Sequence, residues 1–317
     1  MNKIKEFDIV IINWNSGTQL KECITSIYNS RKTNCDLNKI VVVDNASSDK
    51  SIEILNQDIQ NLKLIYNNEN LGFGKACNQG AKECSSEFIL FLNPDMLVYE
   101  DTFLKLFEYI EKVSNPEVAV YGVQLLNANG NIQKSCATFP TLWNFFVRSS
   151  GLNKINQQLF KPYIMEYWNH QESRAVNHVI GAFYLIQRDI FTHLGGFDER
   201  YFVYSEDLDL SKRVKDLGYK SFYFTGAQAY HKGGGTSDQV KAKRLFYNLR
   251  SRIIYAFKHL GMFKGFLTLL ITLLIEPVSR TFFLLMKGNF KELLESLKGF
   301  SMLYLDVINI IKLGLKK

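Results

Sequence analysis

The first half of the chain alternates short apolar runs with segments of helical periodicity, and no other feature limits the possible folds as strongly. The runs FDIVIIN, KIVVVDN and EFILFLNPD are rich in β-branched or aromatic residues and predict buried strands. Between the first two, the apolar residues of 20–28 recur at the spacing of one helix face. Such alternation predicts an α/β fold with a doubly wound, mostly parallel sheet and right-handed crossovers.

Further segments continue this pattern. We expect strands at LKLIYN and EVAVYGVQLL, and helices at SIEILNQ, GFGKACNQGAKEC and TFLKLFEYIEK. In doubly wound sheets, ligands bind beyond the carboxyl ends of the strands. Those ends are polar or acidic in this chain, at Asn13–Asn15, Asp44–Asn45 and Asn93–Asp95.

Charge divides the chain into two regions. Residues 241–317 carry fourteen Lys or Arg against four Asp or Glu, whereas the first 240 residues carry 24 against 27. We expect one α/β domain over residues 1–239, with a donor-binding half to about residue 125 and an acceptor half after it, and a helical region over 240–317. A segment that is both basic and apolar suits an anionic membrane surface, while the slightly acidic body argues against nucleic acid as a partner.

The C-terminal region contains eleven uncharged residues, GFLTLLITLLI, between Lys264 and Glu276. A transmembrane helix needs about 20 apolar residues. The sequence therefore predicts an interfacial helix or a membrane-docking helical hairpin. A helical cap on the α/β domain and the interface of a homo-oligomer are the alternatives.

Cysteine usage and the N-terminus indicate the compartment. The five cysteines are odd in number and include no CxxC pair, which favours a reducing cytosol. The start, MNKIKEFDIVIINWN, contains no small-residue cleavage site and predicts a first strand rather than a signal peptide. We therefore expect a cytoplasmic protein, peripheral at the inner face of the cell membrane.

Several polar residues at strand and helix ends are ambiguous when each motif is taken alone. Asp95 offers the oxygen that a hard cation prefers, but an ordinary strand-ending turn explains it better. Asp44 and Asn45 suit either hydrogen bonds to a base or ribose, or a turn. Gly72 and Lys75 enter a helix where phosphate could bind, although a plain helix start is the better interpretation.

The segment GGFDERYFVYSEDLDLSKRVKDLGY is the most informative. If Glu206–Leu217 is helical, Asp207 heads an apolar face and should point toward the body or a cleft. That face continues at Leu210, Val214 and Leu217. Asp209 should point away and pair with Arg213 at i+4. A task in a cleft and simple helix capping are the competing roles for Asp207.

His231 lies before three glycines in AYHKGGGTS, a loop suited to closing over a metal–phosphate group. A solvated loop histidine is the common alternative. The other four histidines have no partner spacing and are interpreted as structural: His170, His178, His193 and His259.

Taken together, these segments resemble glycosyltransferase family 2, and within it the rhamnosyltransferase-like group. The resemblance covers about residues 7–236 and rests on motifs in the family's order: IVIINWN, VVVDNASSD, NENLGFGKACNQG, FLNPD, GAFYLIQRDIFTHLGGFDERYFVYSEDLDLSKRVKDLGY and then a histidine. Any one of these motifs is weak, but their order and spacing together make coincidence improbable. The resemblance implies a GT-A fold.

The resemblance also implies roles for single residues. Asp207 resembles the catalytic base, and Asp95 and His231 resemble ligands of a divalent cation, Mg²⁺ or Mn²⁺. Asp44 resembles the residue that contacts the base or ribose of the donor. The other residues assigned to donor binding are Asn13, Asn15, Asn45, Gly72, Lys75 and Asn93. One departure stands out, because Asn93 replaces the first carboxylate of the family's DXD motif and removes one charge from the metal site.

The implied reaction is an inverting transfer from a nucleotide-sugar donor, with L-rhamnose from dTDP-rhamnose as the favoured case. The implied acceptor is a hydroxyl of a glycan or a polyprenyl-linked glycan. A UDP-sugar donor and a non-catalytic sugar- or partner-binding module remain alternatives. A nicotinamide-dependent oxidoreductase is disfavoured, because NWNSG after the first strand lacks the glycine fingerprint.

Overall fold

The computed structural model describes residues 5–55, 60–233 and 240–316. The chain forms two compact units, the first drawn from residues 1–137, 169–198 and 207–236, and the second from 138–168, 199–206 and 237–317. The second unit thus contains the C-terminal region expected from residue 240, and also two inner segments that the sequence had suggested for the α/β domain. The inner segment 138–168 joins it because Gly151 lies against Phe283, where an added Cβ would come within 2.3 Å of the ring.

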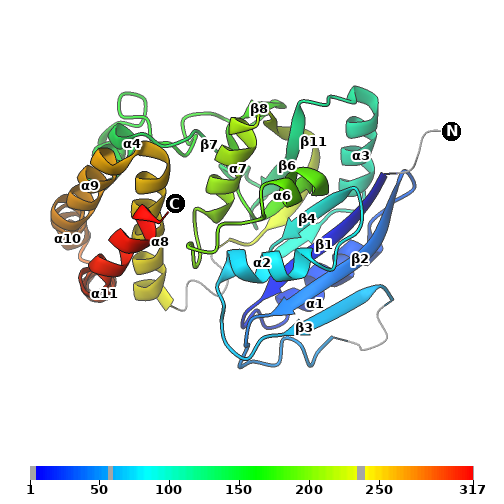
Figure 1. The fold of residues 1–317 in the computed structure, drawn as a ribbon, viewed down its shortest axis with the longest axis horizontal. Coiled ribbons are helices and arrows are strands. Elements are labelled where there is room, and N and C mark those ends of the chain that lie inside the picture. The colour runs from blue at the N-terminus through cyan, green and yellow to red at the C-terminus, as the bar shows by residue number, and fades with distance from the viewer. Residues whose placement is uncertain (1–4, 56–59, 234–239, 317) are drawn as a thin grey trace. The chain divides into compact units, whose positions relative to one another are not determined.

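The first unit is built on a mixed sheet (Figure 1). Its strands are β1 (Lys5–Asn13), β2 (Cys35–Asp44), β3 (Leu62–Tyr66), β4 (Phe88–Leu92), β5 (Met96–Val98), β6 (Val118–Leu126), β8 (Arg174–Val176), β10 (Phe183–Gln187) and β11 (Lys220–His231). The strand order is β3-β2-β1-β4-β10-β6-β11-β5, with β8 paired to β11. Strands β1 to β4 run parallel, as do β6 and β11, whereas β10 is antiparallel to both β4 and β6. The predicted α/β fold with a mostly parallel sheet is therefore confirmed.

Helices cover both faces of this sheet. They are α1 (Gln19–Asn29), α2 (Phe73–Ala81), α3 (Thr102–Val113), α6 (Arg188–His193) and α7 (Glu206–Asp216), and a small sheet pairs β7 (Cys136–Ala137) with β9 (His178–Val179). The apolar stripes of α1 and α3 share one core with Phe7, Ile9 and Leu90. On the other face, Val10 contacts α2, and the Phe91 ring packs at a tilt against Phe191 of α6. Burial on both faces explains why the strands are almost continuously apolar.

The helix expected at SIEILNQ is not formed, since the described part of that segment, residues 51–55, makes turns. Ser51 is completely buried, and its hydroxyl bonds to the side chains of Asn13 and Asp49. Serine side chains that bond to neighbouring groups compete with helix formation. This local network therefore outweighs a weak helical pattern.

The second unit is helical. Its elements are α4 (Leu142–Ser150), α5 (Leu152–Ile155), α8 (Lys241–Leu260), α9 (Met262–Leu270), the π-helical turn η2 (Ile271–Ile275), α10 (Glu276–Met286) and α11 (Phe290–Leu315). The elements α9, η2 and α10 form one continuous helical segment of 25 residues that contains an 18-residue window of mean hydropathy 1.8, and by length and composition it is long and apolar enough to cross a membrane. The expectation that the apolar segment is too short was wrong, because the helix continues past Glu276.

Candidate active site

One edge of the sheet collects the polar ends of several strands. The last residues of β1 and β2, Asn13 and Asp44, are paired in register, and β4 runs parallel beside β1 up to Leu92. Because β10 is antiparallel to β4, its first residue, Phe183, lies at this same edge. The motifs that follow β1, β2 and β4 and that precede β10 therefore meet at one place, as the doubly wound pattern predicts.

Asn13 and Asp44 interact with each other rather than standing side by side as open ligands. Asn13 has no exposed surface, and its Nδ2 donates to Asp44 Oδ1 at 2.7 Å and to two serine hydroxyls. The second oxygen of Asp44 accepts from the Ser47 N–H at 3.2 Å. From the sequence, we expected Asn13 to contact a donor directly. The structure corrects this expectation, because Asn13 is buried and its side chain fixes the orientation of Asp44.

Asn15 and Asn45 also use their side chains within the loops. Asn15 has a left-handed φ of 52°, and its Oδ1 accepts the N–H groups of Ser48 and Asp49. Asn45 is buried, accepts the Leu71 N–H at 3.0 Å and donates to the Gly72 carbonyl at 3.2 Å. These two residues join the loop after β2 to the loops after β1 and before α2.

The start of α2 is less open to an anion than the sequence suggested. Gly72 precedes the helix with φ 85°, and its N–H donates to Asn70 Oδ1 at 2.9 Å, so this group is already engaged. The predicted phosphate contact of the Gly72 N–H is therefore not available in this conformation. Lys75 is exposed in the first turn of the helix.

Asp95 and His231 lie together although 136 positions separate them in the sequence. Asp95 follows β4 and directly precedes β5, while His231 ends β11 and pairs with Met96 across the antiparallel ladder. The distance from Asp95 Oδ1 to His231 Nε2 is 3.6 Å, and both side chains are about nine-tenths buried. Two ligands that each lie about 2.0–2.2 Å from a shared cation are roughly 3–4 Å apart, so the spacing fits such an ion.

The tautomer of His231 also fits a metal ligand. Its Nδ1 lies 2.7 Å from Gln133 Oε1, while Gln133 Nε2 donates to the His231 carbonyl at 2.7 Å. Because that amide oxygen only accepts, Nδ1 carries a proton, and Nε2 is the ring nitrogen that would bind a cation on the side of Asp95. Gln133 was not identified from the sequence, and no spacing signal connects it to His231.

An open cavity of about 650 Å³ adjoins this pair. Its wall includes Ser16 and Gly17 after β1, Asp95, Tyr230 and Lys232. Of the glycine loop expected to close there, residues 234–239 lie outside the described residues. Within the described ranges, no three His, Cys, Asp or Glu residues form a metal-binding cluster. Because position 93 is asparagine, Asp95 is the single carboxylate of its motif. The Asn93 backbone N–H donates to the Ala182 carbonyl.

Asp207 lies in the first turn of α7 with its side chain 18% exposed. Its Oδ2 accepts the Gly181 N–H at 2.7 Å and its Oδ1 accepts the Leu208 N–H at 2.8 Å. An added Cβ at Gly181 would come within 3.1 Å of Oδ2, so glycine permits this close approach. Gly181 and Ala182 lead into β10, and Ala182 accepts the Asn93 N–H at 3.0 Å. Asp207 is thereby tied to the sheet edge that carries Asn93.

A buried chain of hydrogen bonds lies behind Asp207. His178 Nε2 is 3.6 Å from Asp207 Oδ2, and Nδ1 is 2.9 Å from the Ser211 hydroxyl, which lies 3.0 Å from the Tyr184 hydroxyl. Burial lowers the pKa of His178, and the Asp207 carboxylate acts in the opposite direction. From the sequence alone, His178 is interpreted as structural, because no spacing rule links it to Asp207.

The helix pattern around Asp207 needs two corrections. Leu210 and Val214 are fully buried as expected, but Leu217 is 41% exposed because α7 ends at Asp216. Asp209 does pair with Arg213, at 2.8 Å, yet it is completely buried rather than pointing away. Arg213 compensates this burial, and it also donates to two backbone carbonyls in the preceding loop.

The strand order and the acidic edge define the GT-A class of glycosyltransferases. A solved structure described as the mannosyltransferase PcManGT from Pyrobaculum calidifontis in complex with GDP-Man and Mn²⁺ shares this fold, with TM-score 0.55 and 17% identity over 97% of this chain and 76% of that one. A structure of GalNAc-T7 with UDP, GalNAc and Mn²⁺ has TM-score 0.59 and 16% identity, covering 81% of this chain and 48% of that one.

The chain belongs to glycosyl transferase family 2, whose sequence profile matches residues 8–194. It is similar to the N-acetylglucosaminyl-diphospho-decaprenol L-rhamnosyltransferase of Mycobacterium tuberculosis, with 24% identity over 81% of this chain and 86% of that protein. It is also similar to rhamnosyltransferase WbbL of Escherichia coli, with 27% identity over 55% of this chain and 63% of that protein. The expected family and enzyme class, a nucleotide-sugar glycosyltransferase, are confirmed.

Proposed function

We propose that this enzyme transfers L-rhamnose from dTDP-rhamnose, with inversion, to a hydroxyl of a glycan or a polyprenyl-linked glycan. The observation that carries the reaction type is the carboxylate of Asp207, which two backbone N–H groups hold beside the polar sheet edge. The choice of sugar and acceptor is supported by similarity to proteins named as rhamnosyltransferases, one of which acts on a decaprenol-linked substrate by name.

Asp207 is the proposed catalytic base. Its carboxylate takes the proton of the acceptor hydroxyl while the hydroxyl oxygen attacks the anomeric carbon. The bond from that carbon to the diphosphate breaks on the opposite face, and a single displacement inverts the configuration. A base in this role contributes about 10²–10⁴-fold to the rate.

Asp95 and His231 are the proposed ligands of Mg²⁺ or Mn²⁺. Such a cation, when bound, would neutralise charge on the diphosphate leaving group. The 3.6 Å spacing and the His231 tautomer support this assignment. The site has only one carboxylate because position 93 is asparagine, so we expect weak cation binding in the absence of the donor's phosphate oxygens.

The remaining assigned residues divide into contacting and positioning groups. Asp44 is the proposed contact to the base or ribose, oriented by Asn13. Asn15 and Asn45 position the loops around it, and Lys75, exposed at the start of α2, is the proposed cationic contact to the diphosphate.

We further propose that the C-terminal region docks the enzyme on anionic lipid at the inner face of the cell membrane. Its fourteen Lys or Arg outnumber four acids. Each basic residue near such a surface contributes about 1 kcal/mol to the free energy of binding, so a fraction of the fourteen is sufficient for the enzyme to bind the membrane. The bound enzyme would then encounter a lipid-linked acceptor by diffusion in the plane of the membrane.

A donor panel tests this function. The full chain is incubated with dTDP-rhamnose, UDP-sugars and GDP-sugars, and release of nucleoside diphosphate is measured with an acceptor bearing free hydroxyls. We expect dTDP-rhamnose to give the highest kcat/KM. A UDP-sugar that performs better would replace the donor assignment, and no turnover with any donor would favour the non-catalytic binding module.

A further inference from the structure

The 25-residue helical segment Met262–Met286 has two distinct sides. Thr268, Thr272 and Glu276 recur every four residues and are all buried. Both threonine hydroxyls donate to backbone carbonyls of their own helix four residues earlier. This polar side is therefore satisfied within the protein and needs no water.

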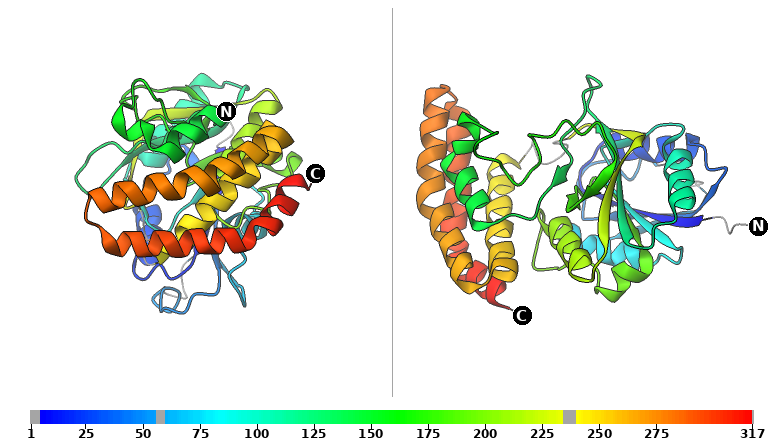
Figure 2. Two further views of the ribbon diagram at one scale, coloured as in Figure 1. Left: turned by 90° about the vertical axis from the view of Figure 1, so that its left-hand side faces the viewer. Right: turned by 90° about the horizontal axis from the view of Figure 1, so that it is seen from above.

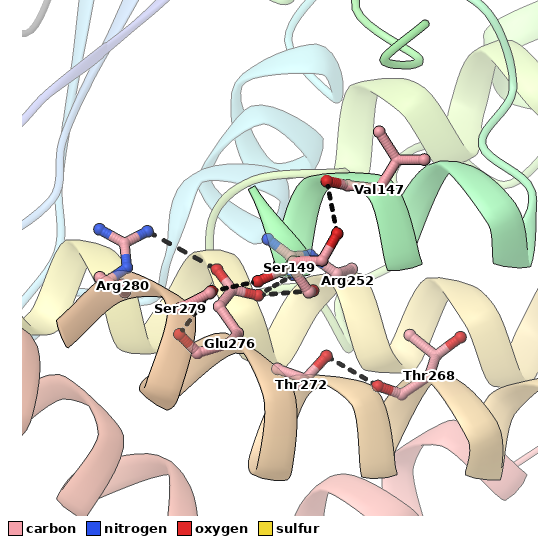
Figure 3. Close-up of polar contacts among 9 residues, drawn as sticks. Val147, Ser149, Arg252, Thr268, Thr272, Glu276, Ser279 and Arg280 are labelled. Carbon is pink, nitrogen blue, oxygen red and sulfur yellow. Dashed lines mark hydrogen bonds and ion pairs between the residues drawn. The ribbon is translucent and has the colours of Figure 1, made fainter. Parts of the chain in front are cut away.

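The polar side is bound to α8 by an ion pair and to α4 by hydrogen bonds (Figure 3). Glu276 accepts from the Ser149 hydroxyl at 2.8 Å and is paired with Arg252 of α8. Arg252 also donates to the Ser149 hydroxyl at 3.1 Å, and Ser279 donates to the Ser149 carbonyl. Glu276 and Arg252 are each about 95% buried. The segment Met262–Met286 is thus held along its length against α4 and α8.

The opposite side of the segment carries a stripe of exposed apolar residues. They are Phe266, Leu270, Leu274, Val278 and Phe282. A four-residue repeat rotates by about 40° per step in an α-helix of 3.6 residues per turn. The wider π-helical turn Ile271–Ile275 in the middle takes up part of this rotation and keeps the stripe on one side.

Helix α11 extends this apolar surface. Its exposed apolar residues follow helical spacing at Phe290, Leu294, Leu297, Leu305 and Ile308. Both helices approach α8 closely through glycines, since an added Cβ at Gly265 or Gly314 would meet Phe257 within 3 Å. The two helices lie side by side with α8 behind them, as Figure 2 shows, so their stripes form one outer face of this unit.

The fully exposed charges around this outer face are basic. Lys264 lies at one end of the helical pair, and Lys287 and Lys291 lie at the turn between the two helices, all exposed. Of the four acidic residues of 241–316, Glu276 is buried and Glu292, Glu295 and Asp306 are partly exposed, and each accepts from a basic or amide side chain of the same unit. An apolar face bordered by exposed lysines complements an anionic lipid surface.

We propose that the outer face of α9, α10 and α11 lies flat in one leaflet of an anionic bilayer, so that Met262–Met286 does not cross the membrane. This inference rests on the proposed membrane docking and specifies its orientation. A crossing helix would have to leave α8 or take α8 with it. Leaving would strand Glu276 and Arg252, and α8 carries six Lys or Arg in twenty residues, which the bilayer core excludes.

Depth measurements distinguish the two orientations. Single cysteines replace Phe266, Leu274 or Phe282 in the full chain with Cys84→Ser, since the other native thiols are buried. Each variant is spin-labelled and bound to vesicles of phosphatidylglycerol and phosphatidylethanolamine, and its accessibility to oxygen and to a water-soluble nickel complex is compared. Residues 266 and 282 are about 24 Å apart along a helix. We expect equal, shallow depths for all three labels, whereas a deep central label between two shallow ones would overturn the proposal.

A charge substitution tests whether the apolar face itself binds. We expect Leu274→Glu to weaken vesicle binding by at least about tenfold in a flotation assay. Val113→Glu, at an exposed apolar residue that ends α3, is the matched control and should bind as the unaltered chain does. Equal binding of both variants would mean that charge alone holds the protein, and would overturn the proposal.

Two further outcomes separate the orientation from its premise. If the unaltered chain does not float with anionic vesicles, the proposed docking fails and the orientation with it, although transferase activity with a soluble acceptor would remain. If light scattering without lipid gives a dimer that Leu274→Glu abolishes, the face binds a second copy of the chain, and the lipid proposal is wrong.

Discussion

The Asp207→Asn substitution separates a catalytic base from a structural carboxylate. The side chain keeps its size and one oxygen, but an amide does not take the acceptor's proton. In the structure, the two carboxylate oxygens accept from different N–H groups, those of Gly181 and Leu208. Asparagine therefore leaves one of these N–H donors without its acceptor. The loss of unfolding free energy can be worked out from this one unpaired group.

The loss of stability and the loss of rate differ in size. A buried N–H that loses its acceptor costs about 1–3 kcal/mol, and a domain that starts at about 5–15 kcal/mol remains folded after that loss. Loss of a general base lowers the rate by about 10²–10⁴-fold, equivalent to about 2.7–5.4 kcal/mol of barrier. We therefore expect a folded protein with slightly reduced stability, nearly unchanged donor affinity and strongly reduced kcat.

The assay combines urea unfolding, calorimetry with the donor and transfer kinetics at saturating donor. Asp216→Asn is the matched control, because Asp216 lies on the same helix, is exposed and pairs with Lys212 at the surface. It should change none of the three quantities appreciably. Turnover of Asp207→Asn within a few-fold of the unaltered enzyme would refute the assignment and leave Asp207 as a structural tie between α7 and the loop before β10.

The other predictions concern donor, cation, acid stability and the helical unit. Asp44→Ala should raise the donor Kd while kcat at saturating donor stays nearly constant; a selective loss of kcat would contradict the donor role. Mn²⁺ should tighten nucleoside diphosphate binding in calorimetry, and Asp95→Ala should abolish that effect; tightening that persists would remove Asp95 from the cation site. Burial lowers the pKa of His178, so its neutral ring stabilises the fold fully above the unfolded pKa of about 6.5, and stability is lost as the pH falls below it. His178→Gln should show a shallower acid decline of the urea midpoint, and an unchanged slope would argue against this origin. Glu276→Ala should cost about 3–5 kcal/mol, and combining Glu276→Leu with Arg252→Met should recover most of it; additive losses would show that the pair is not coupled.

The sequence predicts the sheet and most helices of the first unit because its strongest signals are local. Buried strands, helix faces and polar strand ends follow from residue type and period, and the sheet confirms them. The meeting of Asp95 with His231 is different, because it depends on the antiparallel pairing of β5 with β11. Period and spacing do not give that pairing, and only the resemblance to a known family suggested it.

The direction of single side chains was the weakest part of the prediction. Asn13 and Asn45 were expected to face a donor, yet each bonds to neighbouring loops and is at least 98% buried. His178 and Gln133 were not assigned, although one lies against Asp207 and the other fixes the His231 ring. Their roles depend on contacts between residues far apart in the chain, which no single-sequence pattern contains.

The C-terminal region shows how a charge in the sequence misleads about a surface. Glu276 marked the end of the apolar run, and on that basis the segment was judged too short to span a membrane. In the structure, the carboxylate turns inward to Arg252 and the helix continues to Met286, so the outward side has no charge between Lys264 and the helix end. The face that a bilayer would meet is thus set by an internal ion pair.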